Sequence, residues 1–196
     1  MQDFGGQPDG RPPHWKRIAM PQIIKNQAIV DDDWLVVRAA EDGSLPPPHA
    51  LPAGKVLVPF SYWKASRDTL PGVRTKQQIG VWLAPDDEPA DLVVDFDEIA
   101  LIAIDFPVFR DGRGYSIARL LRERYGYKGE IRAIGDVLHD QLAYLSRCGF
   151  DAFALRADKD IQYALRAFGE LTVHYQTAND EKLPLFRRRG AAGAAA

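Results

Sequence analysis

Two carboxylates in the middle of the sequence follow apolar runs, at the positions where α/β proteins place their sites. Asp105 follows the run LIAI, and Asp136 comes two residues after the run IRAI. Because ligands of parallel α/β sheets bind outside the carboxyl ends of the strands, we take both as catalytic candidates, as acid/base or positioning groups. The alternative is structural: Asp105 would cap amides of its own loop, and Asp136 would cap Leu138 and His139 in the helix that follows.

The loop DGRGYS, residues 111–116, lies between them and precedes a predicted helix. The first turn of a helix offers unpaired N–H groups and a partial positive charge, which together bind anions. Arg113 is the best-placed cation of this loop and our third catalytic candidate. The residues that we expect to bind the ligand beside it are Arg110, Asp111, Gly112, Gly114, Tyr115 and Ser116. The loop is neither GxGxxG nor GxxxxGK[ST], and in the alternative interpretation Asp111 or Ser116 only caps the helix.

Arg132 alternates with Ile131 and Ala133 in a run that we expect to be a mostly buried strand. A buried arginine needs a carboxylate partner, because an unpaired charge inside a protein is strongly destabilising. We expect Asp105 or Asp136, from an adjacent strand, to be that partner, and we count Arg132 among the ligand-binding residues.

The composition excludes several classes of site and partner. The net charge is −2, so the chain has no overall attraction for nucleic acid or anionic membranes. The single cysteine, Cys148, excludes an internal disulfide, a Cys-based iron–sulfur cluster and a Cys-rich zinc site, and we expect a buried, inert thiol there. The four histidines are scattered, and we predict no metal site. No apolar run reaches about 18 residues and no secretory signal is present, so we expect a cytoplasmic protein with no membrane partner.

The elements that must position these residues are short apolar strands that alternate with helices. From Lys55 onward, strands are expected at 56–58, 79–83, 101–104, 131–134 and 152–155, with a sixth at 171–175. Helices are expected at 62–68, 89–98, 115–125, 138–147 and 159–168. This alternation predicts an α/β fold with a parallel sheet of about five to six βα units, either a partial barrel or an open doubly wound sheet.

We divide the chain into four parts. Residues 1–19 are polar and rich in Gly and Pro, and we expect a disordered tail. Residues 20–54 hold three short β-type runs and a Pro-rich stretch, which predict a small N-terminal β meander followed by a loop. Residues 55–186 form the α/β domain, and residues 187–196, RRRGAAGAAA, are expected to be a second disordered tail.

The run DFPVFRDGRGYSIARLLRERYGYKGEIRAIGDVLHDQLAYLSRCGFDAF resembles the hallmark of an uncharacterised bacterial protein family, and GVWLAPDDEP upstream fits as well. The resemblance covers residues 79–171. Members of that family are described as probable oxidoreductases of sulfite reduction, because their genes lie beside those for assimilatory sulfate and sulfite reduction. The resemblance implies a pathway and no mechanism, since the family has no established catalytic residue to carry over.

Two functions are therefore expected. The first is an oxidoreductase, or an oxidoreductase component, of assimilatory sulfite or sulfate reduction that binds a small anionic substrate or a nucleotide at the DGRGYS loop. The cofactor is unknown from the sequence, because it contains no Cys pair, no haem motif, and no nicotinamide or flavin fingerprint. That gap motivates the second function, a non-catalytic accessory protein that docks on sulfite reductase or phosphosulfate reductase.

Overall fold

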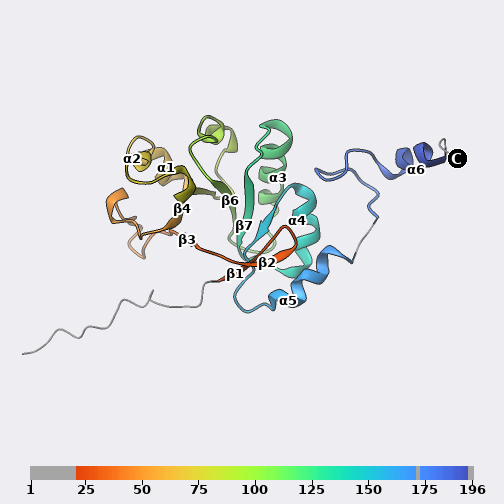
Figure 1. The fold of residues 1–196 in the computed structure, drawn as a ribbon, viewed down its shortest axis with the longest axis horizontal. Helices are drawn as coiled ribbons and strands as arrows, with labels where there is room; N and C mark the ends of the chain where they lie inside the picture. The colour runs from red at the N-terminus through yellow and green to blue at the C-terminus, as the bar shows by residue number, and fades with distance from the viewer. Residues whose placement is uncertain (1–20, 171–172, 194–196) are drawn as a thin grey trace, which may run out of the picture.

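Eight strands form one curled sheet in the computed structural model, which describes residues 21–170 and 173–193 (Figure 1). The strands are β1 (Gln22–Lys25), β2 (Ala28–Asp31), β3 (Trp34–Val36), β4 (Lys55–Pro59), β5 (Ile79–Leu83), β6 (Leu101–Phe106), β7 (Glu130–Gly135) and β8 (Ala152–Phe153). Their order across the sheet is β2-β1-β8-β7-β6-β5-β4-β3. The α/β class is confirmed, but the sheet has eight strands and not the five to six predicted.

The six strands from β3 to β8 are parallel and lie in sequence order. In a doubly wound sheet the strand order reverses at a switch point, and helices cover both faces. Here the order never reverses, so right-handed crossovers place the connecting helices on one face. The sheet curls into a half barrel, and of the two predicted architectures the partial barrel is therefore the correct one.

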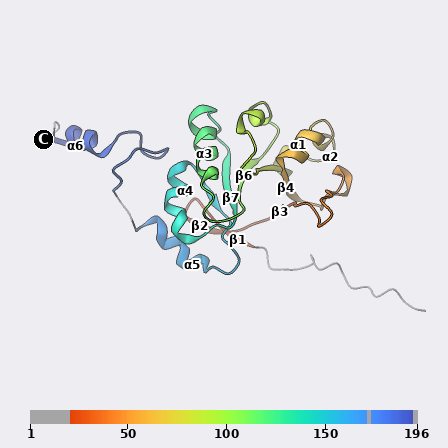
Figure 2. The same ribbon diagram turned by 180° about the vertical axis from the view of Figure 1, so that it is seen from behind.

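The three N-terminal strands do not form the separate meander that the sequence predicts. β1 and β2 form an antiparallel hairpin, and β1 pairs antiparallel with β8. β3 pairs with β4 at the opposite edge of the sheet, although only Asp32 and Asp33 separate it from β2. We call these two residues the β2–β3 crossing, which runs between the two edges in Figures 1 and 2.

The β2–β3 crossing requires the curl of the sheet. In a flat sheet of eight strands, the outermost strands would lie about 34 Å apart, since neighbouring strands are spaced by about 4.8 Å. A two-residue connection spans only about 10 Å when fully extended. The two edges must therefore approach each other, as they do in a barrel that is partly closed.

The helices lie in the connections between strands and after β8. The α-helices are α1 (Phe60–Ser66), α2 (Leu70–Val73), α3 (Arg113–Arg119), α4 (Leu142–Cys148), α5 (Ile161–Ala164) and α6 (Leu185–Gly193). The 3-10 helices are η1 (Pro48–Ala50), η2 (Lys76–Gln78), η3 (Pro89–Asp95), η5 (His139–Gln141) and η6 (Leu165–Phe168), and the π-helical turn η4 (Leu120–Arg124) continues α3. The predicted helices at 115–125, 138–147 and 159–168 thus each consist of two helical pieces.

The core lies on both faces of the sheet but is larger on the helix-covered face. There, buried helix residues pack on the strands, among them Trp63, Leu92, Ile117 and Leu142. The concave face holds a smaller cluster of Leu57, Leu101, Ala103 and Ile134, against which Trp34 and Trp82 pack. Strands with both faces covered need apolar side chains at nearly every position, which explains their unbroken apolar runs.

Several predicted features lie at the limits of the described residues. The predicted tail 1–19 lies outside them. The predicted strand 171–175 begins with two residues that are also outside them, and residues 173–175 belong to no strand. The predicted tail 187–196 overlaps α6, and its last three residues are not described.

Cys148 is buried at the end of α4, as expected. None of the helices that the structure describes has the length and apolar character that a membrane crossing requires.

Candidate functional site

Asp105 lies near the carboxyl end of β6 and forms a two-point ion pair with Arg38, which follows β3. The guanidinium donates to the two carboxylate oxygens at 2.6 and 3.3 Å, and it lies over the ring of Trp82, 5.2 Å from its centroid. Only 7% of Asp105 is exposed, whereas about half of the arginine side chain faces solvent. The predicted catalytic position thus holds a buried carboxylate whose charge is balanced by an arginine from the far edge of the half barrel.

Asp136 follows β7 and connects the loops on both sides of it. One carboxylate oxygen accepts the backbone N–H of Phe109 at 2.9 Å, and the other accepts Nη1 of Arg156, after β8, at 2.8 Å. The alternative interpretation, in which Asp136 caps the following helix, is wrong, because the N–H of Leu138 donates to the side chain of Gln141 at 3.0 Å. Asp136 therefore holds the loop after β6 against the loop after β8.

Arg113 is held by two carboxylates at the start of α3. Its backbone N–H and Nε donate to one oxygen of Asp111 at 3.1 and 3.0 Å, and Nη2 donates to the other oxygen at 2.7 Å. Its Nη1 donates to Asp86, in the loop after β5. Hydrogen bonds from Arg113 lower the pKa of the Asp111 carboxyl, and the same bonds raise the pKa of the guanidinium. Three donors of Arg113 thus converge on one carboxylate, and Asp111 binds the first amide of the helix.

The other residues of the loop divide into packed and exposed ones. Gly114 is buried, and a Cβ atom there would lie 2.6 Å from Cζ of Phe106. Tyr115 packs between the rings of Phe106 and Tyr144, and its burial raises the pKa of its hydroxyl. The exposed residues of the predicted site are Arg110, Gly112, Arg113 and Ser116. Gly114 and Tyr115 therefore position α3 on the sheet, and the four exposed residues form the solvent-facing side of the loop.

Arg132 is buried on the concave face of β7, but its partners are not the predicted ones. Its Nη1 donates to Asp32 at 2.7 Å, and its Nη2 lies 2.8 Å from Glu130. Asp105 and Asp136 bind other arginines, so the predicted pairing is wrong. The reason is the β2–β3 crossing: it brings Asp32 onto the concave face, whereas the sequence placed it in a separate meander. Arg132 stands apart from the loop 111–116 and holds the crossing to the sheet.

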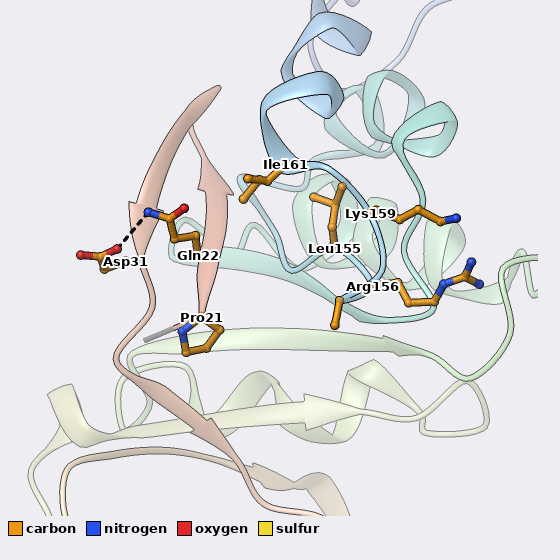
Figure 3. Close-up of a pocket in the computed structure, with 8 residues that line it drawn as sticks. Pro21, Gln22, Asp31, Leu155, Arg156, Lys159 and Ile161 are labelled. Carbon is orange, nitrogen blue, oxygen red and sulfur yellow. Dashed lines mark hydrogen bonds between the residues drawn. The ribbon is translucent and has the colours of Figure 1, made fainter. Parts of the chain in front are cut away.

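A pocket of about 620 Å³ adjoins the carboxyl ends of the strands, between the loop after β8 and the β1–β2 hairpin (Figure 3). Its lining residues are Pro21, Gln22, Asp31, Leu155, Arg156, Ala157, Lys159 and Ile161. In Figure 3 the charged ends of Arg156 and Lys159 point away from the hairpin, on which Gln22 and Asp31 are hydrogen-bonded at 3.2 Å. Because Arg156 also binds Asp136, this pocket borders the candidate site.

The loops at the carboxyl ends of the strands are therefore joined by arginine–aspartate pairs. Sequence reasoning missed three of the partners: Arg38, Asp86 and Arg156. Each comes two or three residues after a strand, and the rule that selected Asp105 and Asp136 applies to them too. Guanidinium donors form charge-assisted, bidentate hydrogen bonds with anionic oxygens, so this edge is suited to binding and orienting an oxyanion. Within residues 21–170 and 173–193, no three His, Cys, Asp or Glu side chains are grouped as metal ligands.

Comparisons with known proteins place the chain in a family. No curated protein and no solved structure matches it. A family model described as "bacterial protein of unknown function (DUF934)" matches residues 80–186, more than half of the 196 residues. The matched part contains Asp105, Asp136, Arg156 and the loop 111–116, whereas Arg38 lies outside it. The chain belongs to this family of bacterial proteins of unknown function.

Proposed function

We propose that this protein is an oxidoreductase, or an oxidoreductase component, of assimilatory sulfite or sulfate reduction. It binds an oxyanion or a phosphate-bearing ligand at the loop 111–116. Asp105 and Asp136 are the groups that orient the ligand or exchange protons with it. The pathway rests on the resemblance of the central run of the sequence to a family with genes beside those of sulfate and sulfite reduction.

One observation supports the ligand class best: the convergence of Arg113 donors on a single carboxylate. The backbone N–H, Nε and Nη2 of Arg113 surround Asp111 at 2.7 to 3.1 Å, as they would surround the oxygens of a sulfate or phosphate group. About half of the Arg113 side chain is exposed, so a ligand can reach it from solvent. The exposed Arg110 and Ser116 supply further donors on the same loop.

The binding test is thermal unfolding with sulfite, sulfate and adenosine 5′-phosphosulfate as probes. A ligand at a hundred times its Kd stabilises the folded state by about 2.7 kcal/mol. For a domain of this size that free energy raises Tm by about 5–10 °C. Arg113→Gln should abolish the shift. Arg124→Gln, at the far end of the same helical segment, is the matched control and should keep it. If none of the three probes moves the wild-type Tm, the anion site is disproved.

The oxidoreductase part has its own test. The purified protein should carry an absorbing group in the visible range or a bound redox cofactor that mass spectrometry identifies. A colourless protein without any bound redox molecule, and without turnover of sulfite in the presence of a chemical electron donor, would contradict redox activity.

A second function, an accessory protein that docks on sulfite reductase or phosphosulfate reductase, is favoured by a different observation. Val108 and Phe109 are 43% and 52% exposed at the tip of the loop after β6. The backbone of Phe109 is held on both sides, by Asp136 and by Nε2 of Gln141, which donates to its carbonyl at 2.7 Å. Apolar side chains on a braced loop are typical of a contact with another protein.

Co-purification tests this second function. Tagged wild-type protein should retain the reductase, and Val108→Ser/Phe109→Ser should release it. Val73→Ser, which changes an apolar residue of similar exposure on α2, should not. A reductase that is fully active and correctly assembled in a strain without this gene would exclude the accessory role.

A further inference from the structure

The C-terminal segment 173–193, which we call the C-terminal arm, is anchored to the helices by its residues 176–182. Asn179 donates its N–H to the carbonyl of Arg147 at 2.9 Å, and Nη2 of Arg147 donates to the carbonyl of Gln176 at 2.7 Å. Lys182 forms an ion pair with Glu123 at 2.9 Å. Beyond these contacts the arm reaches away from the half barrel, as both Figure 1 and Figure 2 show.

The outer part of the C-terminal arm has contacts within itself. The N–H of Leu185 donates to the carbonyl of Tyr175 at 3.3 Å, and Nη2 of Arg188 donates to the carbonyl of His174 at 2.7 Å. Arg188 also pairs with Glu181 at 3.4 Å. These contacts fold the arm back on itself, so α6 and residues 174–175 form one small unit that projects from the body.

This unit exposes large apolar side chains. Val173, Tyr175, Leu183 and Phe186 are 59%, 69%, 50% and 61% exposed. The guanidinium of Arg187 lies over the Phe186 ring, 5.9 Å from its centroid, and both Arg187 and Arg189 are exposed. Apolar side chains gathered on a projecting segment indicate a surface that another protein covers. The arginines indicate that the covering surface is acidic.

The chain itself carries a surface of that kind, around η3. Residues 86–98, DDEPADLVVDFDE, contain seven acidic residues and no lysine or arginine. Asp95 is buried and paired with Arg67, and Asp86 and Asp91 pair with Arg113 and Lys64. Val94, in η3, is 76% exposed, which is the highest exposure among the large apolar residues of the described chain. Asp97 and Glu98 beside it are exposed and form no ion pair with the described residues. The η3 surface thus combines an exposed apolar side chain with negative charge, and the arm combines apolar side chains with positive charge.

We propose that the C-terminal arm of one copy of this chain docks on the η3 surface of a second copy. The arm of the same copy points away from the half barrel and does not contact its own η3. In a pair related by a two-fold axis, each arm covers the η3 surface of the other copy. The pair therefore contains the same contact two times, and each contact buries the apolar side chains of one arm and of one η3 surface. Phe186 and Val94 form the apolar centre of the contact, and Arg187 and Arg189 face Asp97 and Glu98.

Sedimentation equilibrium of the full chain in 50 mM and 500 mM NaCl tests this proposal. The wild type should be a dimer whose Kd rises at least tenfold at the higher salt, because opposite charges across the contact are screened. Phe186→Ser and Val94→Ser should each raise Kd at least tenfold. Both residues are exposed in the single copy, so these changes leave the fold intact. Val73→Ser is the control and should leave Kd unchanged.

Charge reversal identifies the pairing. Arg187→Glu/Arg189→Glu and Asp97→Lys/Glu98→Lys should each weaken the dimer. A mixture of the two variants at equal concentration should restore it, because both contacts of the mixed pair join opposite charges. A wild type that stays monomeric up to millimolar concentration overturns the proposal. So does a dimer that the Phe186 and Val94 changes leave intact, because another surface then forms it.

Discussion

The buried pair between Arg132 and Asp32 allows a quantitative test of how the half barrel is held together. Arg132 is 2% exposed and Asp32 is 8% exposed. In Arg132→Met, Glu130 keeps its pair with Lys25 at 2.7 Å, whereas Asp32 keeps only the N–H of Trp34 at 3.3 Å. Removing one partner of a buried pair leaves an uncompensated charge and costs about 3–5 kcal/mol. With a urea m value of about 2 kcal/mol/M, the unfolding midpoint should fall by about 2 M.

Two further variants separate the buried pair from the general loss of an arginine. Arg132→Met/Asp32→Leu removes both charges and should recover most of the lost free energy of unfolding, to within about 1–2 kcal/mol of the wild type. Arg119→Met breaks an exposed pair with Glu123 and should cost no more than about 0.5 kcal/mol. A loss below about 1 kcal/mol in Arg132→Met, measured by urea unfolding, would refute the role of this pair in fixing the β2–β3 crossing.

Three further predictions concern packing and titration. Gly114→Ala should lower the free energy of unfolding by about 1–2 kcal/mol, measured in urea, because the added Cβ would overlap Phe106. In the control Gly112→Ala the added Cβ has no neighbouring atom within 4 Å, so the free energy of unfolding should change by less than about 0.5 kcal/mol. Equal costs in the two variants would contradict the packing role of Gly114. Burial raises the pKa of Tyr127, so the unfolded chain ionises first and stability should fall as the pH rises above the ordinary tyrosine value of about 10. Tyr127→Phe should reduce that alkaline loss in pH-dependent unfolding, and an unchanged slope would show that other groups cause it. Burial also raises the pKa of the Cys148 thiol, so it should react with a disulfide reagent at pH 8 far more slowly in the native protein than in urea, and equal rates would contradict its burial.

The sequence predicts the strands from β4 onward because each is an apolar run bounded by polar or turn residues. The same reasoning locates Asp105 and Asp136 at strand ends, where the structure places them. The sequence also predicts strands at the runs that form β1, β2 and β3, but it does not predict their partners. Strands of three or four residues contain too little pattern to specify whether they pair with a neighbour in sequence or with β8 and β4 across the sheet.

The same limit applies to the charged side chains. Arg38 and Asp105 are 67 residues apart in the sequence, and Arg132 and Asp32 are 100 apart. Local spacing cannot predict such pairs, because the curl of the sheet brings them together. Asp111 and Arg113 are two residues apart, and that contact follows from the turn before a helix, which the sequence does predict.

The most direct test of the central claim, an oxyanion site at the loop 111–116, is an NMR titration of isotope-labelled protein with sulfate and adenosine 5′-phosphosulfate. We predict that the largest shifts occur at the backbone amides of Arg113, Tyr115 and Ser116 and at Nε of Arg113. They should saturate at millimolar ligand or below and disappear in Arg113→Gln. Shifts that are largest in another part of the protein, or that do not saturate, would contradict the site.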